Sequence, residues 1–142
     1  GPIYHGYYSD IIREGVIGSP TSLQQEMFDV AREACYVGID AMKPGRRIGD
    51  VADAVDAFIG ESKYATENAM NGWCGHALGT GVHEFPMIES SCDDVLEPGM
   101  IFAIEPYFYR EGVGSLGIEE NVLVTDTGTE NLTPSTSELI II

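Results

Sequence analysis

The sequence predicts an α+β fold, in which a short strand region, two helices and then an antiparallel sheet follow one another along the chain. Residues 3–18 are rich in Ile, Tyr and Val, and two amphipathic stretches follow between residues 21 and 62. From Trp73 onward, short apolar runs alternate with Gly, Pro and Asp, as in antiparallel sheets. With 142 residues and 44% apolar content, the chain can bury one modest core, so we expect one domain or part of one.

The first strand region is IYHGYYSDIIREGVIG, residues 3–18. Its β-branched and aromatic residues favour one or two strands, broken at Gly6 and Gly15, with Asp10 inside them. A turn signal at Gly18-Ser19-Pro20 ends it.

Two helices are expected next. In the first, Thr21 and Gln24 have the spacing of a capping box, and Lys43–Gly45 should stop the helix. Its apolar residues recur at helical spacing: Met27, Val30, Ala31, Ala34, Cys35, Val37, Gly38 and Ala41. The second should run from about Gly49 to Ser62, with an inner face of Val51, Val55, Phe58 and Ile59.

The clearest later strands are MIFAIEPYFY (residues 100–109) and LGIEENVLVT (residues 116–125). The glycine-containing REGVGS joins them, so we expect a hairpin. A turn at Gly128 should lead into another strand, and residues 138–142 should form a last one.

The composition of the chain argues against some classes of binding partner. The chain has 23 acidic and 7 basic residues, a net charge of −16, which argues against nucleic acid or an anionic membrane as partner. Such a surplus is typical of a solvated acidic surface, and a site for hard cations also draws on carboxylates. Cys35, Cys74 and Cys92 form no C-x-x-C pair, which favours a reducing, cytoplasmic setting. We find neither a membrane-spanning run nor a signal peptide.

The stretch GHALGTGVHEFP, residues 75–86, holds two histidines seven residues apart. Its three glycines disfavour a helix, and an odd separation would place the two side chains on opposite faces of a regular strand. We therefore expect a strand or loop, bent at the glycines, that brings His76 and His83 into one cleft.

Five polar residues stand alone within apolar runs: Asp10, His76, His83, Glu105 and Glu119. Buried unpaired carboxylates are costly, so several that point inward need a shared positive partner, and a divalent metal supplies one. Carboxylates with one imidazole suit Mn, Fe, Co or Zn. Simpler interpretations stay open: Asp10 could stabilise a turn, Glu119 could lie on an exposed strand face, and a lone histidine is more often a core residue than a ligand.

The order of these motifs resembles a known family. GHALGTGVHEFP, LEPGMIFAIEPYFY and GIEENVLVTDTGTENLT resemble the metal-binding motifs of the methionine aminopeptidase, Xaa-Pro aminopeptidase and prolidase superfamily, which has the pita-bread fold. GYYSD followed by Arg13 resembles its second aspartate motif. The resemblance covers essentially the whole chain.

The resemblance implies two divalent ions and a role for each residue. Asp10 and Glu119 would bridge the ions, His76 would be the single imidazole ligand, and Glu105 would bind one ion and move a proton. His83 would lie off the metals, where it contacts the substrate or the tetrahedral intermediate.

Some positions depart from the family pattern. This chain has Ile12 where the family usually has threonine, Gly117 where it often has arginine, and Gly72 where many prolidase-like members have histidine. These changes leave metal binding expected and the substrate open. Cys74 could be a soft metal ligand, but we favour a buried small side chain.

The family's first ligand aspartate lies eleven residues before the second, which is before Gly1. We therefore expect residues 1–142 to be a partial catalytic metallopeptidase domain that lacks this ligand and the preceding half of the fold. On this expectation, the chain alone binds metal weakly and hydrolyses nothing at a useful rate.

Three functions are considered. The first is a dinuclear metallopeptidase that acts on a peptide substrate near its N-terminus, closer to the Xaa-Pro group than to methionine aminopeptidase because of EPYFY and GIEENVLVT. The second is a creatinase-like relative with another small substrate, and the third is a metal-free binding module. The four visible ligand positions disfavour the third. The resemblance also suggests a homodimer.

Overall fold

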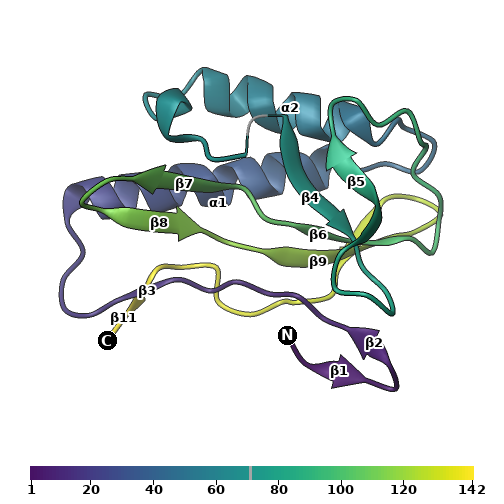
Figure 1. Ribbon diagram of the computed structural model, residues 1–142, viewed down its shortest axis with the longest axis horizontal. Helices are drawn as coiled ribbons and strands as arrows, with labels where there is room; N and C mark the ends of the chain where they lie inside the picture. Colours follow the sequence, from purple (N-terminus) through teal and green to yellow (C-terminus); the bar gives the residue numbers. More distant parts are fainter. Residues whose placement is uncertain (71) are drawn as a thin grey trace.

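The computed structural model describes residues 1–70 and 72–142. It confirms the predicted order of short strands, two helices and a sheet (Figure 1). The elements are β1 (Ile3–Tyr4), β2 (Tyr7–Tyr8), β3 (Gly15–Val16), α1 (Ser22–Ala41), α2 (Gly49–Gly60), the 3-10 helix η1 (Ala65–Glu67), β4 (Trp73–Ala77), β5 (Glu84–Glu89), β6 (Ile101–Ile104), β7 (Tyr107–Arg110), β8 (Gly114–Gly117), β9 (Glu120–Val124), β10 (Thr129–Asn131) and β11 (Ile140–Ile141).

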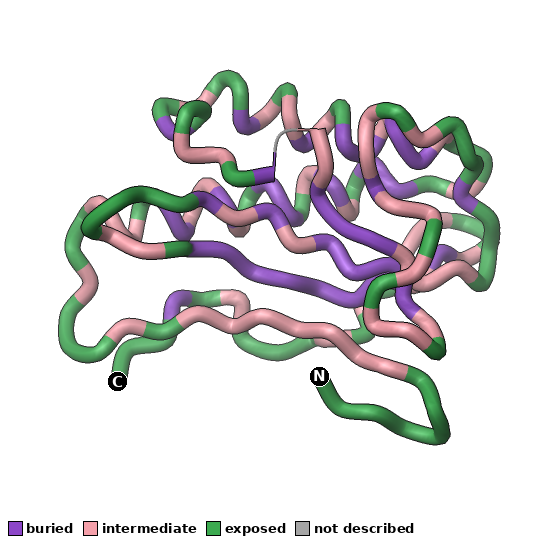
Figure 2. Tube along the Cα trace, viewed as in Figure 1, coloured by how far each residue is buried: buried purple, intermediate pink, exposed green. Residues whose placement is uncertain are grey.

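The main sheet has five strands in the order β10-β9-β6-β4-β5, and all neighbouring strands are antiparallel. The helices α1 and α2 pack against each other and cover one face of this sheet (Figure 1). Buried residues of both helices and of the central strands form one hydrophobic core. Figure 2 shows the buried stretches of these elements in purple. The opposite face of the sheet is therefore available for a site.

Both helices form as predicted. The side chain of Thr21 accepts a hydrogen bond from the backbone of Gln24, and the reciprocal bond completes the capping box. The helix α1 ends at Ala41, shortly before Lys43–Gly45, and α2 ends at Gly60 rather than near Ser62. Three residues of the predicted apolar faces are only half-buried: Val30, Val37 and Phe58.

The two long predicted strands are each divided in the structure. Residues 100–109 form β6 and β7, and residues 116–125 form β8 and β9. Because Pro106 has no N–H, the ladder cannot continue through it. The predicted hairpin is present as two successive pairs, β6 with β9 and β7 with β8. Glu105 and Glu119 lie in the unpaired interval between these pairs.

The N-terminal region differs from the prediction, since it forms three short strands. The strands β1 and β2 pair as a hairpin, and β3 pairs in parallel with β11. Residues 9–14, which include Asp10, are not in a strand. They are instead held by single backbone bonds, such as those from Glu119 to Ile12 and from Ile140 to Glu14. The predicted turn at Gly128 and the last strand are present as β9-β10 and β11.

The described residues contain no helix that is both long and apolar enough to cross a membrane. All three cysteines are unpaired.

Candidate metal centre

The two histidines come from the β4-β5 hairpin. His76 lies on β4, fully buried. Its neighbour Gly75 has no room for a side chain, because a Cβ there would lie 2.1 Å from the carbonyl oxygen of Ala103 on β6. The register between β4 and β5 shifts beside His76. The ring of His83, just before β5, lies 4.0 Å from that of His76, centroid to centroid, so the hairpin brings both imidazoles together as predicted.

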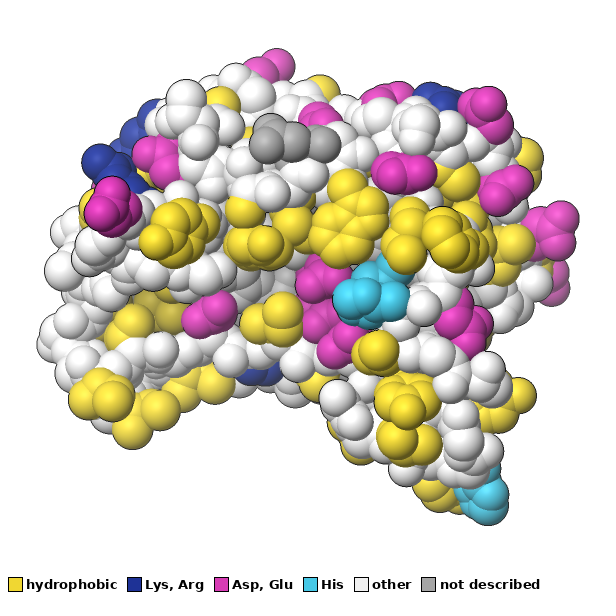
Figure 3. Space-filling view, viewed as in Figure 1, with side chains coloured by type: hydrophobic (Ala, Val, Ile, Leu, Met, Phe, Trp, Pro, Cys, Tyr) yellow, Lys and Arg dark blue, Asp and Glu magenta, His cyan; other side chains and the backbone are white. Residues whose placement is uncertain are grey.

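Three carboxylates surround these rings. The Nε2 atom of His76 lies 3.2 Å from Glu105 Oε1 and 4.0 Å from Asp10 Oδ2. Asp10 Oδ2 also lies 3.9 Å from Nε2 of His83. Asp10, His76 and His83 offer ligand atoms that all lie within 4.8 Å of one another, and so do His76, Glu105 and Glu119. All five residues singled out in the sequence are therefore in one place, and Figure 3 shows acidic side chains beside histidine in a recess of this face.

The exposure of these residues changes across the cluster. His76 and Glu119 are at most 1% exposed, whereas the side chains of Asp10 and His83 are 23% and 56% exposed. The centre is thus closed at Glu119 and open to solvent at His83.

The hydrogen bond of His76 fixes its usable nitrogen. Nδ1 lies 3.0 Å from the carbonyl oxygen of Ala77, which can only accept, so Nδ1 carries the hydrogen. Nε2 is buried without a hydrogen-bond partner among the described residues, and its lone pair faces Glu105. A cation has to lie between two acceptors this close: a proton on Nε2 in the metal-free protein, or a metal ion in its place. Burial lowers the pKa of His76, but the contacts with Glu105 and Ala77 outweigh it, and the net shift is upward.

Glu119 points to the same conclusion. Its Oε1 is buried and has no hydrogen-bond partner in the described part of the chain. Desolvation, followed by repulsion from Glu105 and Asp10, raises the pKa of Glu119 to about 8. A buried carboxylate of this kind is costly unless a cation compensates it. The unpartnered atoms of Glu119 and His76, and a donor set of carboxylates and imidazole, fit a divalent transition metal.

Asn121, which is not among the site residues predicted from the sequence, holds Asp10 in place. Its side-chain oxygen accepts from the backbone N–H of Asp10 at 3.1 Å, and its amide donates to the carbonyl of Asp10. The same oxygen accepts from the hydroxyl of Ser9. Asn121 is 3% exposed, and its place within the apolar run after Glu119 is the signal that could have revealed it.

Arg13 fastens the Asp10 segment to β9. It donates to the carbonyl of Glu119 at 2.7 Å and forms an ion pair with the buried Glu120 at 2.9 Å. Adjacent residues of an extended chain point to opposite faces. Glu120 therefore anchors Arg13, while Glu119 faces the site.

Cys74 is not a candidate ligand. It packs in the hydrophobic core and belongs to neither ligand group. Burial keeps the pKa of its thiol well above the ordinary value, so the sulfur stays protonated.

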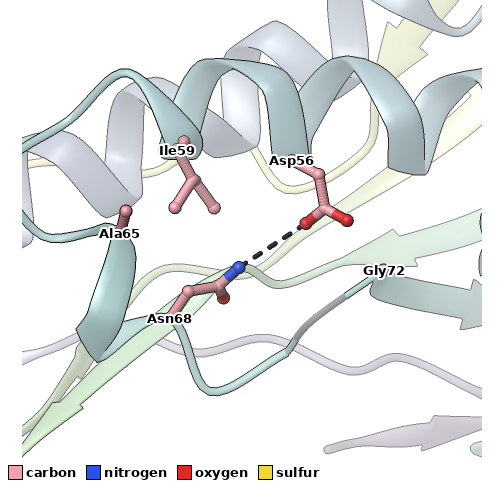
Figure 4. Close-up of a pocket in the computed structure, with 6 residues that line it drawn as sticks. Asp56, Ile59, Ala65, Asn68 and Gly72 are labelled. Atoms are coloured by element: carbon pink, nitrogen blue, oxygen red, sulfur yellow. Dashed lines mark hydrogen bonds between the residues drawn. The ribbon is translucent and has the colours of Figure 1, made fainter.

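The three departures from the family pattern lie beside two cavities. Ile12 and Gly117 line a cavity of about 310 Å³ next to Glu105. Gly72 lines another, of about 400 Å³, where Asn68 donates a hydrogen bond to Asp56 at 3.5 Å (Figure 4). The second cavity is larger, yet none of the five candidate site residues lines it.

Comparisons with known proteins identify the family. The profile of metallopeptidase family M24 matches residues 1–126. The chain belongs to this family. A Xaa-Pro dipeptidase of Pyrococcus horikoshii is 34% identical over 143 residues, which are 99% of this chain and 39% of that protein. The chain therefore spans about two fifths of the length of the relatives it matches.

Solved structures support the same assignment. A Xaa-Pro dipeptidase from Bacillus anthracis superposes with a TM-score of 0.91 and 34% identity, covering 98% of this chain and 39% of that one. The fold is thus that of the pita-bread prolidases. The N-terminal domain of the FACT complex subunit SPT16 from chickpea, at 19% identity and a TM-score of 0.87, covers 97% of this chain and 35% of that one. It shares the fold alone, so function has to be argued from the site.

Proposed function

We propose that this chain carries the metal centre of a dinuclear metal hydrolase that cleaves a peptide bond near the N-terminus, of the Xaa-Pro aminopeptidase or dipeptidase type. One observation carries the proposal: two groups of potential ligands share His76, whose unpartnered Nε2 faces both. The Xaa-Pro dipeptidase relatives give the reaction class. Residues 1–142 would form part of the catalytic domain.

The ligand roles follow from the resemblance, and the side chains concerned lie in the two groups that share His76. Asp10 and Glu119 would bridge two ions, His76 would bind through Nε2, and Glu105 would bind one ion. Mn, Co, Fe or Zn suit this donor set. When bound, such ions lower the pKa of a coordinated water and polarise the scissile carbonyl.

The protein's own side chains would transfer the proton and stabilise the developing negative charge. The Glu105 carboxylate, whose side chain is 14% exposed, would take a proton from the attacking water and deliver it to the leaving amine. His83 stands at the open side and would donate a hydrogen bond to the oxygen that gains negative charge. The backbone bond from Glu105 to Cys74, at 2.9 Å, fixes the start of the Glu105 side chain.

Two alternatives predict different outcomes. A creatinase-like enzyme would keep the metal centre and reject peptides. A metal-free binding module would have no use for Glu119, whose buried carboxylate lacks a partner, and this observation argues against it.

A substrate panel tests the proposal. The protein in its full native length should be assayed with Xaa-Pro dipeptides, longer Xaa-Pro peptides and N-terminal Met peptides under Mn, Co and Zn. We expect cleavage of the Xaa-Pro bond, with turnover at least about 100-fold lower in Glu105→Gln. Metal binding without cleavage of any peptide would favour the creatinase-like function instead.

The cellular setting belongs to the same proposal. Three unpaired cysteines are consistent with a reducing, cytoplasmic location, and the resemblance suggests a homodimer. We also infer that the partner is a peptide, because the net charge of −16 repels nucleic acid and anionic lipid.

A further inference from the structure

The cavity next to Glu105 continues directly from the metal centre. It has a volume of about 310 Å³ and is lined by Ile12, Glu14, Tyr107, Ser115 and Gly117 beside Glu105. Side chains two residues apart in an extended chain share a face. Three such series lead from the centre into the cavity: Asp10-Ile12-Glu14, Glu105-Tyr107, and Glu119-Gly117-Ser115.

Glu14 gives this cavity a negative charge away from the metal ligands. It is half-buried, and burial is the cause that raises the pKa of its carboxyl. Among the described residues, no lysine or arginine lines the cavity. The carboxylate of Glu14 is thus without a positive partner of its own.

Arg13, which precedes Glu14 in the sequence, uses all of its N–H donors in hydrogen bonds to other groups. An arginine has five N–H donors, and each of those of Arg13 has an acceptor. The acceptors are the hydroxyl of Ser135, the carboxylate of Glu120 and the carbonyls of Ile12, Glu119 and Thr133. Arg13 therefore has no donor left for Glu14 or for a substrate carboxylate.

The floor of the cavity cannot readily gain a cation either. A Cβ at Gly117 would lie 2.6 Å from the Cβ of Tyr107 and 3.0 Å from the carbonyl oxygen of Pro106. The approach of β7 and β8 thus keeps this position free of a side chain.

We propose that this cavity binds the positively charged side chain of a lysine or arginine next to the scissile bond, with Glu14 as its counter-charge. The inference rests on the proposed peptidase function. Glu14 lines the cavity but belongs to neither ligand group, so its partner would be the end of a long side chain rather than the reacting groups. A peptide whose free α-carboxylate falls in the cavity would be repelled.

Matched substrates test the proposal. Xaa-Pro peptides that carry lysine, norleucine or glutamate either before or after the proline differ in charge at similar length. We expect kcat/KM to favour lysine over norleucine by about tenfold or more at one of the two positions. Glu14→Gln should abolish this preference, and Glu14→Lys should shift it to glutamate. Glu111→Gln, which removes an exposed charge in the β7-β8 turn, should keep it.

Two outcomes separate this proposal from the peptidase assignment. Calorimetric titration of the same proteins with reduced-bond peptides measures binding without cleavage. A lysine preference in binding that Glu14→Gln removes, without cleavage of any peptide, would support the cavity and overturn the peptidase. Cleavage with the same lysine-to-norleucine ratio in the wild type and Glu14→Gln would keep the peptidase and overturn the cavity.

Discussion

His76 and His83 have adjacent rings and very different exposure, and this contrast predicts different roles. His76 belongs to both ligand groups, so His76→Ala should lower metal affinity by about 100-fold or more. His83 is 56% exposed, and His83→Ala should leave metal content nearly intact while lowering turnover by about 10² to 10³. Metal content after gel filtration measures the first effect and kcat the second.

His5, in the β1-β2 turn, supplies a matched control, and His5→Ala should change neither quantity. Equal loss of metal in His76→Ala and His83→Ala would show that both histidines are ligands.

Glu119 predicts how the stability of the metal-free chain depends on pH. Its pKa is raised from 4.5 to about 8, so the folded state binds the proton more tightly than the unfolded state. The stabilisation is complete below pH 4.5 and is lost as pH rises towards 8, by an amount on the order of a few kcal/mol. Urea unfolding in a chelator between pH 4.5 and 8 measures it. Glu119→Gln should flatten the profile, and a profile of unchanged slope would contradict this assignment.

At the scale of elements, Asn121 on β9 joins the Asp10 segment to the sheet. Asn121→Ala removes bonds to both backbone groups of Asp10, which should cost about 1 to 3 kcal/mol of stability. Because Asp10 would lose its fixed position, metal affinity should also fall. Urea unfolding and metal titration of the same variant measure the two effects. Unchanged metal affinity in a folded Asn121→Ala protein would mean that Asp10 is held by other contacts.

The elements differ in how well the sequence predicts them. The helix α1 is encoded locally by the box of Thr21 and Gln24, so its start was correctly predicted. The division of the two long strands at Glu105 and Glu119 was not predicted, because the apolar pattern continues through both residues. Of the two breaks, only the first is marked in the sequence, by Pro106. The Asn121 clamp joins residues 111 positions apart. The place of Asn121 in an apolar run marks it as a buried polar residue, but nothing near either residue in the sequence predicts that Asn121 and Asp10 meet.

At the scale of the whole molecule, the fold and the site depend on the same divided hairpin. Regular strands over residues 100–109 and 116–125 would have carried Glu105 and Glu119 through the ladder. The interval between the paired segments instead leaves both carboxylates beside His76. The isolation of these acids within apolar runs predicted a cluster, but their distances depend on β4, β6 and β9 assembling from distant parts of the chain.

The acidic character of the whole chain affects how the protein should respond to the removal of metal. With a net charge of −16, the surface could hold cations loosely in many places, whereas the buried donors of His76 and Glu119 select a transition metal. At an ion concentration 100-fold above the dissociation constant, binding to the folded state adds about 2.7 kcal/mol, which should raise Tm by roughly 5 to 10 °C. A chelator should reverse the rise, and Mg²⁺ should give a smaller one because imidazole is a poor ligand for it. Calorimetric scans of the wild type and His76→Ala, each with Mn²⁺, Mg²⁺ or a chelator, measure these shifts. An equal Mn²⁺ effect in both proteins would place the ions on the acidic surface and overturn the metal centre.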